Sequence, residues 1–315
     1  SGCGKTTLLK TVNALVVPDE GHVLVNGRDT AEADPIELRR SIGYAIQGSV
    51  LFPHLTVERN IAFVPSLLNK KDTRRTADAV DKWMEIVGLP ASLKDCYPSE
   101  LSGGQEQRVG IARALAASPD ILLMDEPFSA LDSYLREEVE GEVGSLLAGF
   151  DGTALLVTHN RDEAYRLCRD MIVMDGGQVL RTGTTKEVFA DPGSTAAARL
   201  TGCKNILPCT RVDAHSVRLA GCESLLHLAA EVPEGCTAVG IRAHDFAPCA
   251  PAAPNALPVQ LNSTSENPFD WNLIFTAPDG TTRLWWKVSK TNLTAASPEA
   301  PAFLGTAPQN IMPLG

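Results

Sequence analysis

Two short, uninterrupted apolar runs, Ile-Leu-Leu-Met at residues 121–124 and Ala-Leu-Leu-Val at 154–157, constrain the fold most. Polar residues bound each run, a pattern typical of strands that are buried on both faces of a sheet. A helix should follow each of them. Because helical and short apolar segments alternate from residue 1 to about 195, this region is predicted to be an α/β domain with a mostly parallel sheet.

The other segments of this region fit the same alternation. We expect a helix over 5–15, strands over 22–25 and 42–46, a turn at 26–27, and a closing hairpin over 171–174 and 178–181. Between Thr56 and Gly88 apolar residues recur at helical spacing, as in Val80, Met84 and Val87. An inserted helical subdomain is therefore predicted within about residues 48–118.

After about residue 195 proline becomes frequent and helical spacing fades. Short β-type runs take over, at residues 216–219, 238–242, 257–261, 272–275 and 283–288. Their spacing predicts a small all-β barrel or sandwich. We therefore expect two domains, 1–195 and 196–315, with the proline-containing stretch from about Ala295 as a loop-like tail or a last edge strand.

Charge and hydropathy exclude several classes of protein. The chain has 28 Lys and Arg against 38 Asp and Glu, a net charge of −10, and no basic run, so nucleic acid is a poor partner. No apolar stretch is long enough to cross a bilayer and the start has no signal-peptide pattern, so we expect a soluble, cytosolic protein. The eight cysteines form no CxxC pair, which argues against a zinc site and for reduced thiols.

The first residues carry a phosphate-binding pattern. Gly2-Cys3-Gly4-Lys5-Thr6-Thr7 matches the second half of G-x-x-x-x-G-K-[ST], whose backbone N–H groups close around phosphates at a helix start. Lys5 would reach the β- and γ-phosphates, and the Thr6 hydroxyl would bind Mg²⁺. Alone, the segment also fits a Gly-rich turn before a helix. Because the motif's first Gly lies upstream of residue 1 and no initiating Met is present, we expect the native protein to be about 30 residues longer.

Two further motifs favour the phosphate site. Leu101-Ser102-Gly103-Gly104-Gln105, followed by Gln107-Arg108 and the helical run 112–115, brings backbone N–H groups and a hydroxyl to a helix start. Asp125-Glu126-Pro127 directly follows the apolar run 121–124. Asp125 is placed to hold Mg²⁺ through water and Glu126 to polarise an attacking water. The alternative, a solvated acidic turn, explains less, because two adjacent carboxylates after a buried strand are costly without a cation.

Together these motifs resemble the ATP-binding subunits of ABC transporters, over residues 1 to about 190. In this family Leu101-Ser102-Gly103-Gly104-Gln105 matches the signature motif and Ser129-Ala130-Leu131-Asp132 the D-loop. His159 after Thr158 matches the switch histidine, and Gln47 the Q-loop glutamine; alone, such a His or Gln is more often structural. The expected fold is therefore a P-loop NTPase with an inserted helical subdomain, followed by a small all-β OB-like domain. The resemblance assigns catalytic roles to Glu126, His159 and Gln47, nucleotide binding to Gly2, Cys3, Gly4, Lys5, Thr6, Thr7, Ser102, Gly103, Gly104, Gln105 and Asp132, and metal binding to Thr6, Gln47 and Asp125.

The same resemblance implies an ATP hydrolase that uses ATP and Mg²⁺ and is coupled to transmembrane transport. Two copies would pack head to tail, so that the phosphate loop of one and the signature of the other close over each ATP. The partners implied are transmembrane permease subunits and, indirectly, an extracytoplasmic solute-binding protein, with no nucleic acid. The protein would be peripheral, at the cytoplasmic face of the plasma membrane. An aromatic side chain that stacks on adenine would lie upstream of residue 1.

The type of transporter is indicated by shorter segments. Residues 43–47 and 51–61 resemble bacterial import ATPases, and 62–68 resemble compatible-solute importers of the glycine betaine type. Residues 201–206 and 239–245 resemble the transport-associated OB-type domain of molybdate, tungstate and sulfate importers, which makes an oxyanion the first prediction and a compatible solute the alternative. A generic β extension for dimer contacts, a soluble ABC ATPase of DNA repair or translation, and an exporter are the other possibilities. Arg242 and His244 are expected to be structural.

Overall fold

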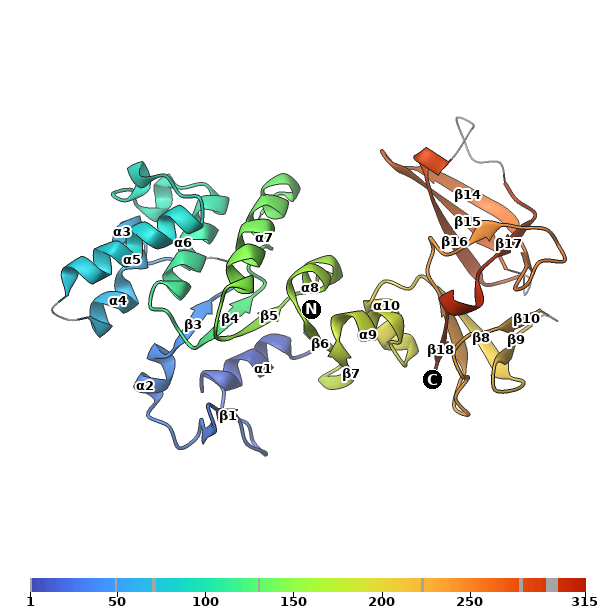
Figure 1. Cartoon of the computed structure of the whole chain (residues 1–315), viewed down its shortest axis with the longest axis horizontal. Helices are drawn as coiled ribbons and strands as arrows, with labels where there is room; N and C mark the ends of the chain where they lie inside the picture. Colours follow the sequence, from blue (N-terminus) through green and yellow to red (C-terminus); the bar gives the residue numbers. More distant parts are fainter. Residues whose placement is uncertain are drawn as a thin grey trace. The chain divides into compact units, whose positions relative to one another are not determined.

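The computed structural model describes residues 2–48, 50–69, 72–129, 131–221, 224–277, 280–292 and 300–315. The chain forms two compact units, Ser1–Arg169 and Asp170–Gly315, each drawn in Figure 1. The domain boundary after residue 195 stays a prediction. Ser1, Ala130, Cys222 and the beginning of the proline-containing stretch, residues 295–299 with Pro298, lie outside the described residues.

A parallel sheet of three strands organises the first unit. Its order is β3 (Ile42–Ala45), β4 (Ile121–Asp125) and β5 (Thr153–Val157). All five residues of β4 are buried, which confirms the prediction for the run at 121–124. The prediction of a doubly buried strand at 154–157 was wrong, because β5 pairs only with β4 in the described sheet and its residues remain partly or fully exposed.

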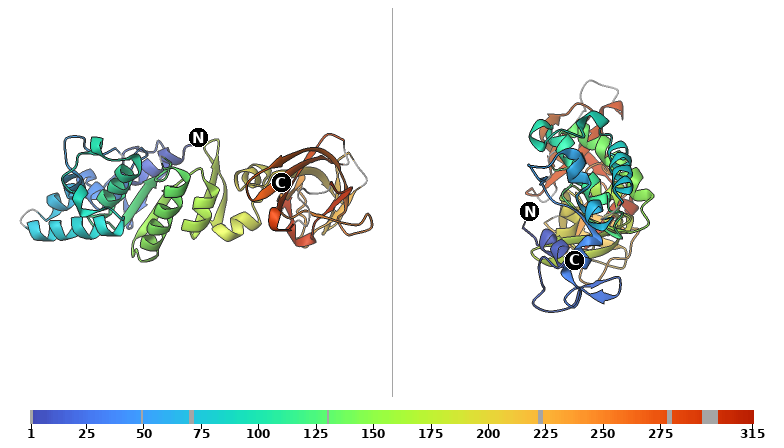
Figure 2. Two further views of the ribbon diagram at one scale, coloured as in Figure 1. Left: turned by 90° about the horizontal axis from the view of Figure 1, so that it is seen from above. Right: turned by 90° about the vertical axis from the view of Figure 1, so that its left-hand side faces the viewer.

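Helices cover both faces of this sheet (Figures 1 and 2). This covering is needed because the central strand β4 has apolar side chains on both faces. Ile121 and Leu123 point to the face where Leu9 of α1 (Lys5–Val12) packs. Leu122 and Met124 point to the opposite face, which is covered by α6 (Gly103–Leu115) and α7 (Ser133–Ala148). A further helix, α8 (Arg161–Leu167), follows β5. The helices expected after each apolar run are therefore confirmed.

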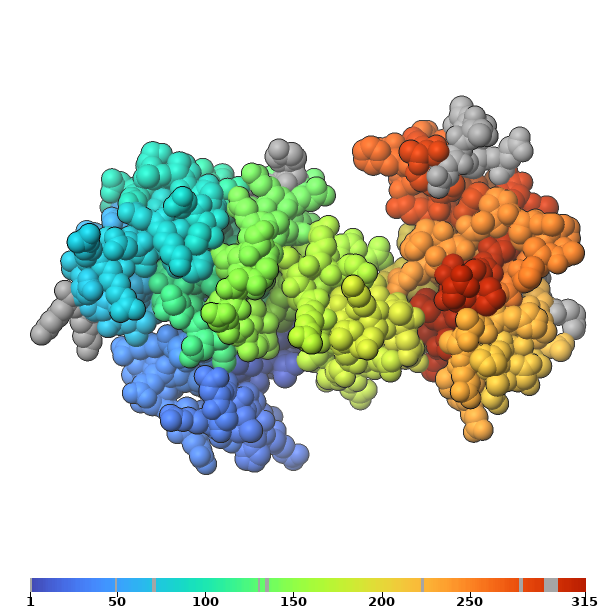
Figure 3. All heavy atoms as spheres, in the orientation of Figure 1, coloured from blue at the N-terminus to red at the C-terminus, as the bar shows by residue number. Residues whose placement is uncertain are grey.

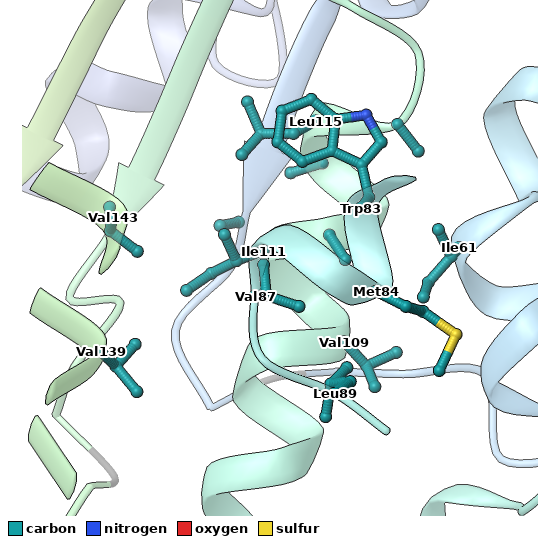
Figure 4. Close-up of a cluster of buried hydrophobic side chains, with 14 of the residues drawn as sticks. Ile61, Trp83, Met84, Val87, Leu89, Val109, Ile111, Leu115, Val139 and Val143 are labelled. Atoms are coloured by element: carbon teal, nitrogen blue, oxygen red, sulfur yellow. The ribbon is translucent and has the colours of Figure 1, made fainter. Parts of the chain in front are cut away.

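The inserted helical region is also present, between β3 and β4. It contains α3 (Val57–Ile61), α4 (Phe63–Leu68), α5 (Thr73–Ile86), α6 and two 3₁₀ turns, η1 (Ala91–Leu93) and η2 (Pro98–Glu100). The residues at helical spacing in α5 face α6, where Trp83, Met84 and Val109 belong to one buried cluster (Figure 4). This cluster continues into α7, so the helical region and the sheet share a core.

One close approach fixes the distance between β3 and α6. A Cβ atom added at Gly43 would lie 2.2 Å from the carbonyl oxygen of Ala114 and 2.9 Å from a side-chain carbon of Pro119. Real Cβ atoms do not approach other atoms this closely. Glycine at position 43 therefore allows the strand to pack directly on the backbone of the signature helix.

The segment between α1 and β3 is less regular than expected. Helix α1 ends at Val12 rather than near Leu15, and the strand expected at 22–25 shortens to β1 (Leu24–Val25), paired with β2 (Arg28–Asp29). The predicted turn is confirmed, because Asn26 and Gly27 have φ angles of 50° and 77°. Helix α2 (Pro35–Arg40) follows, and this segment lies on a different side of the unit from the helical region (Figure 3).

The second unit begins with the predicted hairpin, formed by β6 (Asp170–Asp175) and β7 (Gln178–Thr184) around Gly176-Gly177. Two short helices follow, α9 (Thr185–Ala190) and α10 (Thr195–Leu200). Arg242 holds this region to the β-rich part of the unit, since its guanidinium donates to the carbonyl oxygens of Thr201 and Phe189 at 2.9 and 2.5 Å. These bonds give Arg242 a structural role.

The rest of the second unit is all β, and every described strand pair in it is antiparallel. Its sheets have the orders β10-β9-β8-β11-β18, β12-β17-β13 and β14-β15-β16. Their strands are β8 (Asn205–Arg211), β9 (Ser216–Leu219), β10 (Leu225–His227), β11 (Ala238–Ile241), β12 (Ala247–Pro248), β13 (Leu257–Pro258), β14 (Gln260–Glu266), β15 (Asp270–Thr276), β16 (Arg283–Ser289), β17 (Phe303–Gly305) and β18 (Ile311–Leu314). The five predicted β-type runs are thus confirmed. The last segment is an edge strand, whereas the OB-type assignment stays a prediction.

Candidate functional site

The candidate site forms where the three parallel strands of the first unit end. Because carboxyl ends of parallel strands meet at one edge of the sheet, the residues after β3, β4 and β5 come together there. Gln47 follows β3, Asp125 and Glu126 end β4, and His159 follows β5. Three segments far apart in the sequence therefore supply one edge with an amide, two carboxylates and an imidazole.

The loop before α1 joins this edge through Thr6. Its hydroxyl donates a hydrogen bond to Oδ1 of Asp125 at 3.0 Å. Gly2 and Gly4 both have a φ of 90°, a conformation that residues with a side chain rarely adopt, and Gly4 is the N-cap of α1. No side chain caps that helix start. Its N–H groups therefore face outward without an intrahelical acceptor, as anion binding requires.

Lys5 and Cys3 contact each other within this loop. The Nζ of Lys5 donates to Sγ of Cys3 at 3.1 Å. This hydrogen bond, aided by the positive charge of Lys5, lowers the pKa of the Cys3 thiol below its ordinary value, against an opposing effect of partial burial. The Lys5 ammonium thus favours the thiolate form of Cys3 within the loop.

Glu126 lies at the centre of the edge and has two polar partners. Gln47 donates from Nε2 to one carboxylate oxygen at 3.1 Å, and Nδ1 of His159 lies 3.0 Å from the other. The backbone of Glu126 has a φ of 48°, in the left-handed region, and its N–H donates to the carbonyl of Val157 at 2.8 Å. The turn after β4 therefore bends sharply and aims this carboxylate between the ends of the two neighbouring strands.

Asp125 is the buried carboxylate of the pair, with 2% of its surface exposed. Tyr44 on β3 lies close to it, and the Tyr44 hydroxyl is buried without a hydrogen-bond partner. Burial, together with the charge of Asp125, raises the pKa of Tyr44. Asp125 and the Thr6 hydroxyl bonded to it are oxygen ligands of the kind that Mg²⁺ prefers, and Gln47, which contacts the adjacent Glu126, carries an amide oxygen as a further one.

No group of three or more His, Cys, Asp or Glu side chains that could hold a metal ion occurs among the described residues. Mg²⁺ is usually bound through one or two carboxylates plus substrate phosphates, and the bonded pair Thr6–Asp125 offers one carboxylate and one hydroxyl. The residues present therefore fit a cation that arrives with its nucleotide.

The loop that carries His159 is held by a residue that the sequence analysis did not identify. Glu163, in the first turn of α8, accepts hydrogen bonds from the Thr158 hydroxyl at 2.5 Å and from the Asn160 side-chain amide at 3.1 Å. Its side chain is 4% exposed. A carboxylate four residues after a candidate histidine, in the first turn of a short helix, was the available sequence signal.

The signature residues are not brought to this edge. Ser102 is the N-cap of α6, and it and Gln105 bond each other reciprocally: Gln105 N donates to Ser102 Oγ at 3.3 Å, and Ser102 N donates to Gln105 Oε1 at 2.9 Å. Ser102 and Gly103 are exposed. Asp132 directly precedes α7, where its carbonyl accepts a hydrogen bond from Arg136 N.

A hollow of about 760 Å³ between the β1–β2 hairpin and α2 contains none of the candidate residues.

Comparison with known proteins identifies the family of the chain. Residues 1–129 match the family model described as ABC transporter. A solved structure, described as the dimeric post-hydrolysis state of the ATP-binding cassette MJ0796 bound to ADP and Pi, is similar with 32% identity and a TM-score of 0.52, over 58% of this chain and 82% of that chain. This chain belongs to the ATP-binding cassette family. Its first unit has the P-loop ABC ATPase fold.

Curated relatives of this cassette are transport proteins. The chain is 40% identical over 207 residues to the glycine betaine/carnitine/choline transport ATP-binding protein OpuCA of Bacillus subtilis (66% of this chain, 54% of the relative). It is 41% identical over 234 residues to a sulfate/thiosulfate import ATP-binding protein of Chromobacterium violaceum (74% and 62%), and 45% identical over 194 residues to the glycine betaine uptake protein YehX of Escherichia coli (62% and 63%).

The matched part of the cassette spans between about half and just under two thirds of the length of these curated relatives. In the described part of the chain, every helix is too short or too polar to cross a membrane.

Proposed function

We propose that this cassette binds ATP with Mg²⁺, hydrolyses it, and so drives solute import through separate membrane subunits. The observation that carries the proposal is the edge at which Glu126 lies between Gln47 and His159, beside the bonded pair Thr6–Asp125. The chemistry needs a carboxylate that orients water next to groups that hold a nucleotide's phosphates and cation. ABC ATP-binding proteins of transporters are ATPases of this kind.

Each residue has a role in this proposal. The N–H groups of residues 2–7 and the ammonium of Lys5 would hold the phosphates, and Thr6, Asp125 and Gln47 would hold the Mg²⁺, whose positive charge would offset the negative charge of the phosphates. Glu126 accepts a proton from the attacking water, and His159 donates a hydrogen bond toward the γ-phosphate. In the free chain Gln47 and His159 contact Glu126. When nucleotide and water bind, these two side chains would leave Glu126 and contact the bound molecules instead.

A second copy would complete the site. Because Ser102, Gly103, Gly104 and Gln105 lie at the start of α6, away from the edge, we propose that they, together with Asp132, serve the nucleotide held by a partner chain in a head-to-tail homodimer. The similar cassette solved as a dimer with ADP and Pi supports this proposal. Closing and opening of the pair would move permease subunits, with the cassette peripheral at the cytoplasmic face of the membrane and an extracytoplasmic binding protein delivering solute.

The solute that we propose is a quaternary ammonium compound such as glycine betaine, choline or carnitine. The relatives OpuCA and YehX support this alternative better than the oxyanion that we expected first. Sulfate is the second candidate, because a sulfate/thiosulfate import protein matches the largest share of the chain among the relatives described above. These relatives give no support to molybdate, and nothing in the second unit names a ligand.

Hydrolysis is tested with the purified chain, at a concentration high enough for two copies to pair. Phosphate release from ATP should require Mg²⁺ and should be lost in Lys5→Met, which removes the ammonium at the phosphates. Lys10→Met, on the same helix but beyond the phosphate loop, should keep the wild-type rate. Equal rates in wild type and Lys5→Met would overturn the proposed function.

Import is tested in cells that lack the gene for this chain. Loss of labelled glycine betaine uptake with normal sulfate uptake would support the first solute class, and the reverse pattern the second. If neither uptake changes, the cassette works outside both import classes, for example as a soluble non-transport ATPase.

A further inference from the structure

We infer that Glu163 is a positioning residue that fixes the imidazole of His159 at the candidate site. This inference rests on the proposed function and deepens it. The proposal starts from one geometric fact, that the two residues flanking His159 are both held by the same carboxylate. Thr158 donates to one oxygen of Glu163 and Asn160 to the other, at 2.5 and 3.1 Å.

The loop around His159 is otherwise closed by its own hydrogen bonds. The backbone N–H of Asn160 donates to the Thr158 hydroxyl at 2.9 Å, and Oδ1 of Asn160 accepts from Asp162 N at 2.9 Å as the N-cap of α8. Every polar atom of the Thr158 and Asn160 side chains is therefore used. The loop has one well-defined conformation as long as Glu163 is present to accept both bonds.

His159 itself is not held by burial. Its side chain is 65% exposed, and its ring lies 3.0 Å from Glu126 through Nδ1. An exposed imidazole is not held in one rotamer by packing, and its allowed rotamers depend on the conformation of its backbone. The tethers on both sides fix the Cα–Cβ direction of His159, which aims the ring at the edge where Glu126 lies.

A purely structural role explains Glu163 less well. Within the described part of the chain no Lys, Arg or His forms an ion pair with it, so this buried carboxylate has only neutral donors for its charge. Burying a carboxylate without a cation costs free energy that a neutral side chain at the start of α8 would not. Two oxygens held in one plane are, however, well suited to fix two donors at a set separation.

The test uses Glu163→Ala, which removes both acceptors, and Glu163→Gln as the conservative variant. A glutamine at this position can accept from Asn160 through its oxygen and donate to the Thr158 hydroxyl through its nitrogen, so it preserves both tethers. We expect kcat for ATP hydrolysis to fall at least tenfold in Glu163→Ala, with KM for ATP within threefold, and to recover to within threefold in Glu163→Gln. Asp162→Ala, in the same turn but with an exposed side chain, should behave as wild type.

A double mutant separates positioning from general stability. If Glu163 acts through His159, then Glu163→Ala combined with His159→Ala should be no slower than His159→Ala alone. If the fold loss in kcat of the double variant equals the product of the losses in the two single variants, the inference is overturned. Should Glu163→Ala fail to fold, Thr158→Val, which removes a single tether, replaces it in the same cycle with a smaller expected loss.

Amide hydrogen exchange supplies a readout that does not need hydrolysis. In the wild-type chain the backbone amide of Asn160 donates to the Thr158 hydroxyl. In Glu163→Ala this amide should exchange at least tenfold faster, while the amides of β4 keep their rates. If the wild-type chain releases no phosphate, the proposed function fails, and exchange alone decides the inference. Unchanged exchange at Asn160 would then contradict the tether, and faster exchange confined to residues 158–160 would support it.

Discussion

Thr6 and Asp125 stand 119 positions apart in the sequence, yet the hydroxyl of Thr6 donates a 3.0 Å hydrogen bond to the carboxylate of Asp125. The bond joins the start of α1 to the end of the buried strand β4. In the proposed MgATP complex both oxygens would turn toward the cation, so the bond in the free chain holds the two groups at a distance suited to share it.

From this pair we expect Asp125→Asn to weaken nucleotide binding only when Mg²⁺ is present. The amide is a poorer partner for a divalent cation, so the Kd for MgATP should rise by roughly tenfold or more. In EDTA the Kd for free ATP should stay equal or fall, since a negative charge near the phosphates is removed. Titration of a fluorescent ATP analogue in both buffers measures this, and an equal loss of affinity in both would contradict it.

Glu126→Gln should abolish steady-state hydrolysis while preserving MgATP binding. The amide cannot take the proton of the attacking water, but Lys5, Thr6 and Asp125 still hold the nucleotide. The variant should also accumulate as a closed dimer, visible by size-exclusion chromatography with MgATP. Turnover within a few-fold of wild type would show that another group activates the water.

Ser102→Arg should bind MgATP as a monomer but fail to hydrolyse it, because a bulky cation blocks closure on the partner. Ser102→Ala is the matched control for the lost helix cap, which costs about 1 kcal/mol. Mixing Ser102→Arg with Glu126→Gln subunits should restore hydrolysis to at most roughly a quarter of wild type, since one site of each mixed dimer is intact. Normal hydrolysis by Ser102→Arg alone would refute the two-chain site.

Gly43→Ala should destabilise the first unit by about 3 kcal/mol, because the new Cβ meets the backbone of α6. Gly141→Ala is the matched control, since a Cβ at this exposed position in α7 contacts nothing within 4 Å. It should stabilise the chain by about 1 kcal/mol through helix propensity. Urea unfolding of the three proteins compares them, and equal midpoints for wild type and Gly43→Ala would show that β3 can move away from α6.

Cys3 should react with iodoacetamide at lower pH than an ordinary thiol. The thiolate is the reactive form, and the hydrogen bond and charge of Lys5 lower the pKa of Cys3. The midpoint of the rate against pH should therefore rise in Lys5→Met, and MgATP should protect the thiol. Cys168, whose pKa is raised by burial, is the internal control in peptide mass spectrometry. A midpoint independent of Lys5 would contradict the contact.

The sequence predicted those parts of the site that lie at strand ends. Asp125, Glu126 and His159 follow apolar runs, and parallel pairing of β4 and β5 brings such residues to one edge whatever the details of the loops. The exposure of β5 escaped prediction, because it depends on which strands pair with it and not on its own apolar residues.

The short helices α2, α9 and α10 were not predicted from the sequence. Their starts are set by N-cap side chains, and they are too short to show apolar residues at helical spacing. Asp34, Thr184 and Ser194 each accept a hydrogen bond from a backbone N–H of the helix that follows. Glu163 escaped for a related reason, since its role depends on the direction of a side chain at a helix start. The pairing of β18 with β11 could not be predicted either, because the paired residues lie far apart in the sequence.

In the proposed two-chain site, the separation of Ser102 from the Thr6–Asp125 edge would make hydrolysis depend on how often two copies meet. An isolated chain at low concentration should turn over almost no ATP, and its specific activity should rise with protein concentration until the dimer dominates. Membrane subunits that hold two copies side by side would raise their effective concentration far above that of free chains. Idle consumption of ATP by unassembled cassettes would thereby be low without any dedicated inhibitor.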